Sequence, residues 1–93
     1  ISNIMIYNNY PNPFNPITTI RYDLIEATSV AISIYDMMGK LVKKLINTNQ
    51  TSGYKTIEWN GTNDKGEMVS AGMYFYSIKT STFFQTKKMI LLK

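Results

Sequence analysis

Hydrophobic and polar residues alternate with a period of two along most of the chain, which is the repeat of a half-buried β-strand. Ile20, Tyr22 and Leu24, for example, share one face of an extended segment, while polar and charged residues occupy the other face. The pattern predicts seven strands, at residues 4–7, 18–24, 30–35, 41–46, 54–59, 72–80 and 83–92. The segment 41–46 has an apolar spacing closer to that of a helix, but its shortness favours a strand.

Turn-forming residues separate the predicted strands. Residues 36–39 end in Gly39, which suits the positive-φ position of a bulged hairpin. Residues 47–53 read as a polar loop, residues 60–66 as an Asn/Asp/Gly connection, and residues 81–82 as a tight hairpin. Seven short strands with turn signals every 8–12 residues predict an all-β fold, a seven-stranded antiparallel immunoglobulin-like β-sandwich.

Three aromatic residues fit particular places in such a sandwich. Tyr74 lies near the start of the sixth strand, where a tyrosine corner would bond its hydroxyl to the backbone upstream. Trp59 is expected at the centre of the core, and Phe14, within a proline-rich segment, over one edge. The alternative for Tyr74 and Trp59 is ordinary burial without the corner geometry.

Composition narrows the possible chemistry. The chain has 93 residues, so we expect a single domain spanning residues 1–93. It contains no cysteine and no histidine, which excludes disulfides, thiolate nucleophiles, Cys-ligated metals and histidine-based catalysis. Only six Asp and Glu residues remain as acidic groups. We therefore predict a domain that is not an enzyme and uses no cofactor and no metal.

The net charge of +4 comes from nine lysines and a single arginine, and the lysines are spread over residues 40–93 with adjacent pairs only at 43–44 and 87–88. Nucleic-acid binders gather their basic residues on one face, so the spacing favours lysines that protect strand edges. No apolar run approaches the ~18 residues of a transmembrane segment. Because the chain opens with Ile1, we expect it to be a piece excised from a longer polypeptide, with a cargo domain upstream.

Two segments of the sequence could form ligand sites. Read as a calcium loop, the segment starting at Asn60 has Lys65 and Ala71 where Gly and Glu are required, so it fails. A looser calcium site at Asp64 remains open, although an ordinary turn is favoured. A sugar-binding platform would need several outward aromatics, and Tyr35 with Phe83 or Phe84 is the best candidate.

Several sequence blocks then point to a known family. In chain order they are Tyr10-Pro11-Asn12-Pro13-Phe14-Asn15-Pro16, Thr18-Thr19-Ile20-Arg21-Tyr22-Asp23-Leu24, Tyr35-Asp36-Met37-Met38-Gly39-Lys40, Gly53-Tyr54, Trp59-Asn60-Gly61, Asn63-Asp64-Lys65-Gly66, Gly72-Met73-Tyr74-Phe75-Tyr76 and residues 86–93. Together they resemble the type A C-terminal sorting domain of the type IX secretion system. That domain is itself similar to the Ig-like domain of flagellar hook-capping proteins. The departures, Ile25 for a frequent proline and Met38 for the usual leucine, leave the fold unaffected.

The resemblance implies a function. Such domains direct a fused cargo through the periplasm and across the outer membrane, to the cell surface or the medium. The type IX translocon recognises the folded domain, and a sortase-like peptidase commonly removes it. The family's recognition motifs fall on Pro11, Asn12, Pro13, Gly72, Tyr74, Lys87, Lys88 and Lys93.

The last predicted strand carries apolar residues on both faces, so a single core does not account for all of them. Its odd-numbered residues from Phe83 to Leu91 face one way, and its even-numbered residues from Phe84 to Leu92 face the other. We expect the outer apolar face or Lys93 to contact the secretion machinery. The alternatives are a passive structural or carbohydrate-binding Ig-like module of a secreted hydrolase, and a flagellar hook-capping domain.

Overall fold

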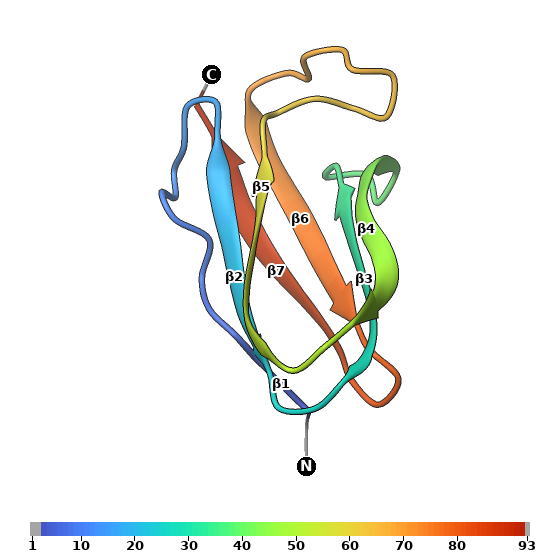
Figure 1. The fold of residues 1–93 in the computed structure, drawn as a ribbon. Helices are drawn as coiled ribbons and strands as arrows, with labels where there is room; N and C mark the ends of the chain where they lie inside the picture. The colour runs from blue at the N-terminus through green and yellow to red at the C-terminus, as the bar shows by residue number, and fades with distance from the viewer. Residues whose placement is uncertain (1–2, 93) are drawn as a thin grey trace.

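The computed structural model describes residues 3–92, and in this range it contains seven strands and no helix (Figure 1). No helix that could cross a membrane is therefore found among these residues. The strands are β1 Ile4–Ile6, β2 Thr18–Leu24, β3 Thr28–Tyr35, β4 Leu41–Gln50, β5 Gly53–Trp59, β6 Gly72–Lys79 and β7 Phe84–Leu91.

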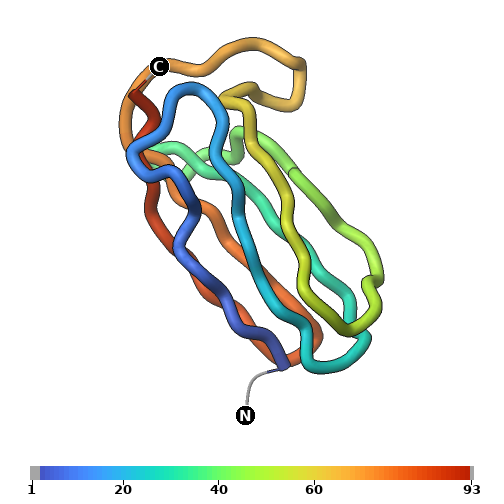
Figure 2. The backbone as a smooth tube through the Cα atoms, turned by 60° about the vertical axis from the view of Figure 1, so that its left-hand side comes forward, coloured from blue at the N-terminus to red at the C-terminus, as the bar shows by residue number. Residues whose placement is uncertain are grey.

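The strands form two antiparallel sheets that face one another. One sheet has the order β1-β2-β5 and the other β4-β3-β6-β7. In the view of Figure 1 the strands β2 and β5 of one layer overlap β7 of the other, and Figure 2 shows the segment before β2 running alongside β7. This arrangement confirms the predicted seven-stranded Ig-like sandwich.

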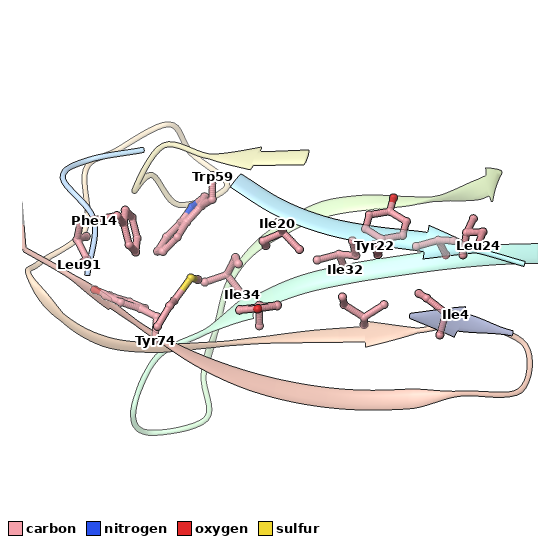
Figure 3. Packing of buried hydrophobic residues seen from close by; sticks show 14 residues of the cluster. Ile4, Phe14, Ile20, Tyr22, Leu24, Ile32, Ile34, Trp59, Tyr74 and Leu91 are labelled. Carbon is pink, nitrogen blue, oxygen red and sulfur yellow. The ribbon is translucent and has the colours of Figure 1, made fainter. Parts of the chain in front are cut away.

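The core fills the space between the sheets with alternate residues of each strand (Figure 3). Along β2, Ile20, Tyr22 and Leu24 are buried, as the alternation predicted, while Arg21 is exposed. Burial of each such side chain contributes about 1.5–3 kcal/mol through removal of apolar surface from water. The buried hydrophobic residues are Ile4, Phe14, Ile20, Tyr22, Leu24, Val30, Ile32, Ile34, Trp59, Tyr74, Tyr76, Ile78, Met89 and Leu91.

Strand β4 departs from the sequence prediction in its length. Residues 47–50, expected to form a loop, continue β4 and pair with the first residues of β3, where Thr28 lies opposite Gln50. The prediction of a loop was wrong because the polar side chains of an edge strand face water, while β3 supplies the backbone hydrogen bonds.

The irregular apolar spacing of β4 also has a structural cause. The register with β3 shifts between Ile32 and Ser33 and again between Ile34 and Tyr35. At each shift β4 has one residue more than its partner, so Leu45 and Val42 are bulged. Bulges interrupt the period of two, which explains the helix-like pattern of a segment that is a strand.

The β3–β4 turn has the predicted form. Gly39 adopts φ 81°, which confirms the positive-φ prediction. One carboxylate oxygen of Asp36 accepts hydrogen bonds from the backbone N–H groups of Met38 and Lys40, each at 2.9 Å. The Asp36 side chain thus closes the turn at both of its ends.

Candidate recognition surface

Tyr74 forms a tyrosine corner. Its hydroxyl donates a 2.6 Å hydrogen bond to the carbonyl oxygen of Ser70, four residues upstream, and its ring is buried. Burial raises the pKa of the Tyr74 phenol, and the negative charge of Asp36 adds to the rise. The corner predicted from the sequence is confirmed, and it places Tyr74 inside the sandwich instead of on its surface.

Three aromatic rings join the proline-rich segment to both sheets at this end of the molecule (Figure 3). The Trp59 ring lies 5.3 Å from Tyr74, edge to face, and 5.8 Å from Phe14. The Trp59 indole also donates a 2.8 Å hydrogen bond to the carbonyl of Thr62. Phe14 and Trp59 are buried as predicted, and their packing fixes the proline segment to the core.

The proline segment lies beside the end of β7. The backbone N–H of Phe14 donates to the Ile90 carbonyl at 3.0 Å, and the N–H of Leu92 donates to the Phe14 carbonyl at 2.8 Å. The side-chain oxygen of Asn12 accepts a 3.0 Å hydrogen bond from the N–H of Ile90. Pro11 and Pro13 remain exposed on either side of Asn12.

Buried polar side chains hold the start of this segment. The Thr18 hydroxyl donates to the Pro11 carbonyl at 2.8 Å, and the Asn9 amide donates to the Thr18 hydroxyl oxygen at 3.0 Å. The carbonyl oxygen of the Asn9 side chain is buried without a hydrogen-bond partner among the described residues. The shape of the segment is therefore set by side-chain bonds as well as by its prolines.

The two adjacent lysines of β7 point to opposite faces of their sheet. Lys87 is half-buried and donates from its Nζ to the side-chain oxygen of Asn8 at 3.3 Å, whereas Lys88 is exposed on the outer face. Ile90 and Leu92 share that outer face and are 41% and 60% exposed. The two-faced last strand is thus as predicted, while Lys93 lies outside the described residues.

A surface groove of about 690 Å³ brings one part of the predicted site together. Its two walls are residues 8–13 and residues 85–88, so Pro11, Asn12 and Pro13 face Lys87 and Lys88. Asn8, Asn9 and Gln85, which belong to none of the named sequence motifs, also line it. Their only sequence signal was their place next to the named motifs.

Gly72 and Tyr74 do not line this groove. Gly72 is paired with Leu91 and has φ 146°, a conformation that side chains disfavour, although an added Cβ would meet no atom within 4 Å. Glycine is therefore required here by the backbone and not by a close neighbour. Together with the corner hydroxyl of Tyr74, it shapes the strand next to β7.

The aromatic residues expected to form a sugar platform lie far apart in the fold. The sheet register places Tyr35 opposite Phe75 and Phe84 opposite Lys79, about 13 Å apart along β6 at the usual rise of a strand. They cannot form one sugar platform. The Asp64 carboxylate accepts a 3.1 Å hydrogen bond from the N–H of Lys44, and residues 3–92 contain no group of three or more acidic residues that could hold a metal.

The family model for the secretion system C-terminal sorting domain matches residues 8–92. The chain belongs to this family. The match confirms the resemblance carried by the sequence blocks and covers the proline segment, the groove and every strand except β1. It identifies the domain as a sorting signal, not a catalyst, and favours sorting over a passive module.

Solved structures share the fold of this sorting domain. Dimeric latent PorU from Porphyromonas gingivalis matches 98% of the chain with a TM-score of 0.74 and 23% identity. PorZ, a surface component of the type IX secretion system of the same organism, matches 95% with a TM-score of 0.64 and 22% identity. The chain spans 10% of the PorU chain and 11% of the PorZ chain.

The hook-capping protein FlgD from Xanthomonas campestris matches 96% of the chain, and 62% of its own, with a TM-score of 0.63 and 21% identity. This match is consistent with the expected similarity to hook-capping domains at the level of the fold. Among curated protein sequences, none is significantly similar to the chain.

Proposed function

We propose that this domain is the export signal of a longer protein and is read as a folded unit by the type IX secretion machinery. Proteins that carry such domains are exported to the cell surface or the medium. The observation that supports the proposal best is the family match over residues 8–92. It is joined by the groove, at which Pro11, Asn12 and Pro13 face Lys87 and Lys88. Any enzymatic activity then belongs to the cargo portion.

The proposed recognition surface consists of the groove and the adjoining outer face of β7. Pro11, Asn12 and Pro13 form one wall, and Lys87 and Lys88 form the other. Exposed side chains on a rigid framework suit recognition, because binding then orders few flexible groups. Gly72 and Tyr74 serve this surface indirectly, since they shape β6, which pairs with β7 in the same sheet.

The finer partners proposed are the outer-membrane translocon, which would hold the folded domain, and a sortase-like peptidase, which would cut upstream of it. Exposed lysines support contact with a translocon by attraction to acidic groups, an interaction that accelerates encounter. Lys93 belongs to this proposal as a third lysine, and it lies outside the described residues.

A fusion experiment tests the proposal. Residues 1–93 are attached to the C-terminus of a periplasmic reporter in a type IX-competent bacterium and in a strain that lacks the translocon. We expect the reporter at the surface or in the medium only in the competent strain. Retention of the reporter in the periplasm of both strains would overturn the function.

A triple variant tests the lysines separately. Lys87, Lys88 and Lys93 are changed to Ala, and the control changes Lys40, Lys65 and Lys79 to Ala, which removes the same charge from exposed positions. Export should fall only in the first variant. Equal export of the two variants would show that Lys87, Lys88 and Lys93 do not take part in recognition, and it would not contradict the sorting function.

A further inference from the structure

The edge of β7 that faces away from β6 is hydrogen-bonded at one end, which we call closed, and lacks partners at the other end, which we call open. β7 is the outermost strand of its sheet. The N–H and C=O of Ile90 point away from β6 and are bonded by Asn12 and Phe14. Since backbone groups of alternate residues point the same way, those of Thr86 and Lys88 face the same edge. No described residue forms a hydrogen bond with Thr86 or Lys88 on that side.

The groove lies along this open part of the edge. Residues 85–88 form one of its walls and residues 8–13 the other, and its volume of about 690 Å³ is that of a ligand site. The segment 12–14 already runs beside β7 as a short parallel bridge from Phe14 to Leu91. An extended peptide in the groove would continue this line toward Thr86 and complete the hydrogen bonding of the edge.

The positive charge of the groove favours an acidic peptide as its partner. Two lysines, Lys87 and Lys88, line it, and none of its lining residues is acidic. Lys87 contacts the neutral side chain of Asn8, and Lys88 is exposed. A second copy of this chain, paired through the same edge, would bring its own Lys87 and Lys88 against these lysines, and like charges opposite one another destabilise such pairing.

We infer that the groove binds an extended acidic peptide, which adds as a strand to the edge of β7 at Thr86 and Lys88. The inference rests on the proposed function, because it gives the recognition surface a partner of defined chemistry: a segment of the secretion machinery with Asp or Glu at alternate positions. Main-chain hydrogen bonds would attach a peptide of any sequence, and an acidic sequence would be selected by the lysine on the face that its alternate acidic side chains share, which is the exposed Lys88 on the outer face.

A peptide titration tests the inference without secretion. Isotope-labelled 1–93 is titrated with acetyl-Thr-Glu-Val-Glu-Val-Thr-amide and followed by amide NMR. We expect saturable shifts centred on Thr86 and Lys88, and binding about tenfold tighter than for the same peptide with Lys in place of Glu. Equal affinity for both peptides, shifts centred elsewhere, or no binding would overturn the inference.

Two variants locate the contacts. Lys88→Glu should weaken the acidic peptide at least about fivefold, while Lys65→Glu, the same charge change on an exposed loop outside the groove, should change it less than about twofold. Thr86→Pro removes an edge N–H and should abolish binding, with the retained spectrum of the remaining residues as evidence of folding. Equal binding by Lys88→Glu and Lys65→Glu would contradict the inference.

The outcomes separate the inference from the proposed function. If the reporter is exported and the acidic peptide fails to bind, the function stands and the strand-addition site is wrong. If the peptide binds and the reporter is retained, the site stands and the sorting function is wrong. Broadening of the Thr86 and Lys88 amides with protein concentration alone would show that a second copy occupies the edge, and would also overturn the inference.

Discussion

The tyrosine corner gives the sharpest test of how the site is built. Tyr74→Phe removes one hydroxyl and keeps the ring against Trp59, 5.3 Å away. The lost hydrogen bond to Ser70 is 2.6 Å long, and such a bond contributes about 0.5–1.5 kcal/mol net. Ser70 is exposed, so its carbonyl regains water and no further penalty is expected. The free energy of unfolding should fall by about 1 kcal/mol, or about 4–8 °C in Tm.

Urea unfolding followed by Trp59 fluorescence measures this change, since Trp59 is the only tryptophan and is fully buried. Tyr54→Phe is the matched control, because Tyr54 is 62% exposed and its hydroxyl forms no hydrogen bond within residues 3–92. Equal stability of the two variants would refute the reasoning that the corner bond stabilises the fold.

The same variant tests whether Tyr74 acts directly in recognition. Well below its Tm, a Tyr74→Phe fusion should be exported as well as the unchanged domain, because the hydroxyl is turned to Ser70 and not to a partner. A folded variant with lost export would show that the machinery reads this hydroxyl itself.

Three further predictions follow from the structure. Burial raises the pKa of the Tyr22, Tyr74 and Tyr76 phenols above 10.0, so the folded state holds these protons more tightly than the unfolded state. The free energy of unfolding should therefore be constant below pH 10 and fall above it, and the fall should be less steep in Tyr22→Phe. Urea unfolding from pH 8 to 11 measures this dependence. Phe14→Ala should cost about 3–5 kcal/mol of unfolding free energy by leaving a cavity beside Trp59, and a cost below about 1 kcal/mol would contradict its place in the core. Asn12→Ala should speed hydrogen exchange at the Ile90 amide about tenfold, whereas Asn15→Ala, a control at an exposed position, should not. Equal exchange in the two variants would show that the Asn12 side chain does not accept the hydrogen bond of the Ile90 N–H.

Local pattern was enough for most of the fold. The alternation at Ile20, Tyr22 and Leu24 marked a strand and its buried face correctly, because side chains of a strand alternate whatever it pairs with. The pattern failed at residues 47–50, where strand or loop depends on whether β3 lies alongside. The bulges at Val42 and Leu45 likewise depend on the partner and leave only an irregular spacing in the sequence.

The candidate site was predictable in its members but not in its arrangement. Pro11, Asn12, Pro13 and the β7 lysines were named from the family resemblance, about 75 residues apart in the chain. The contact of Tyr74 with Ser70, four residues upstream, was predictable because the tyrosine corner is a local feature of the sixth strand. Nothing local indicated that the Asn12 side chain bonds to Ile90, since that contact depends on which segments become neighbours.

By itself, the sequence determined an all-β sandwich with little means for catalysis, because periodicity and the absence of histidine and cysteine are properties of single positions. The tertiary structure alone decided which motif residues are exposed and which are structural. It brought the proline segment to the edge of β7, closed that edge at Ile90 and left it open at Thr86 and Lys88. The physical reason is that an edge is open or closed only through the segments that pack beside it, and these come from the far end of the chain.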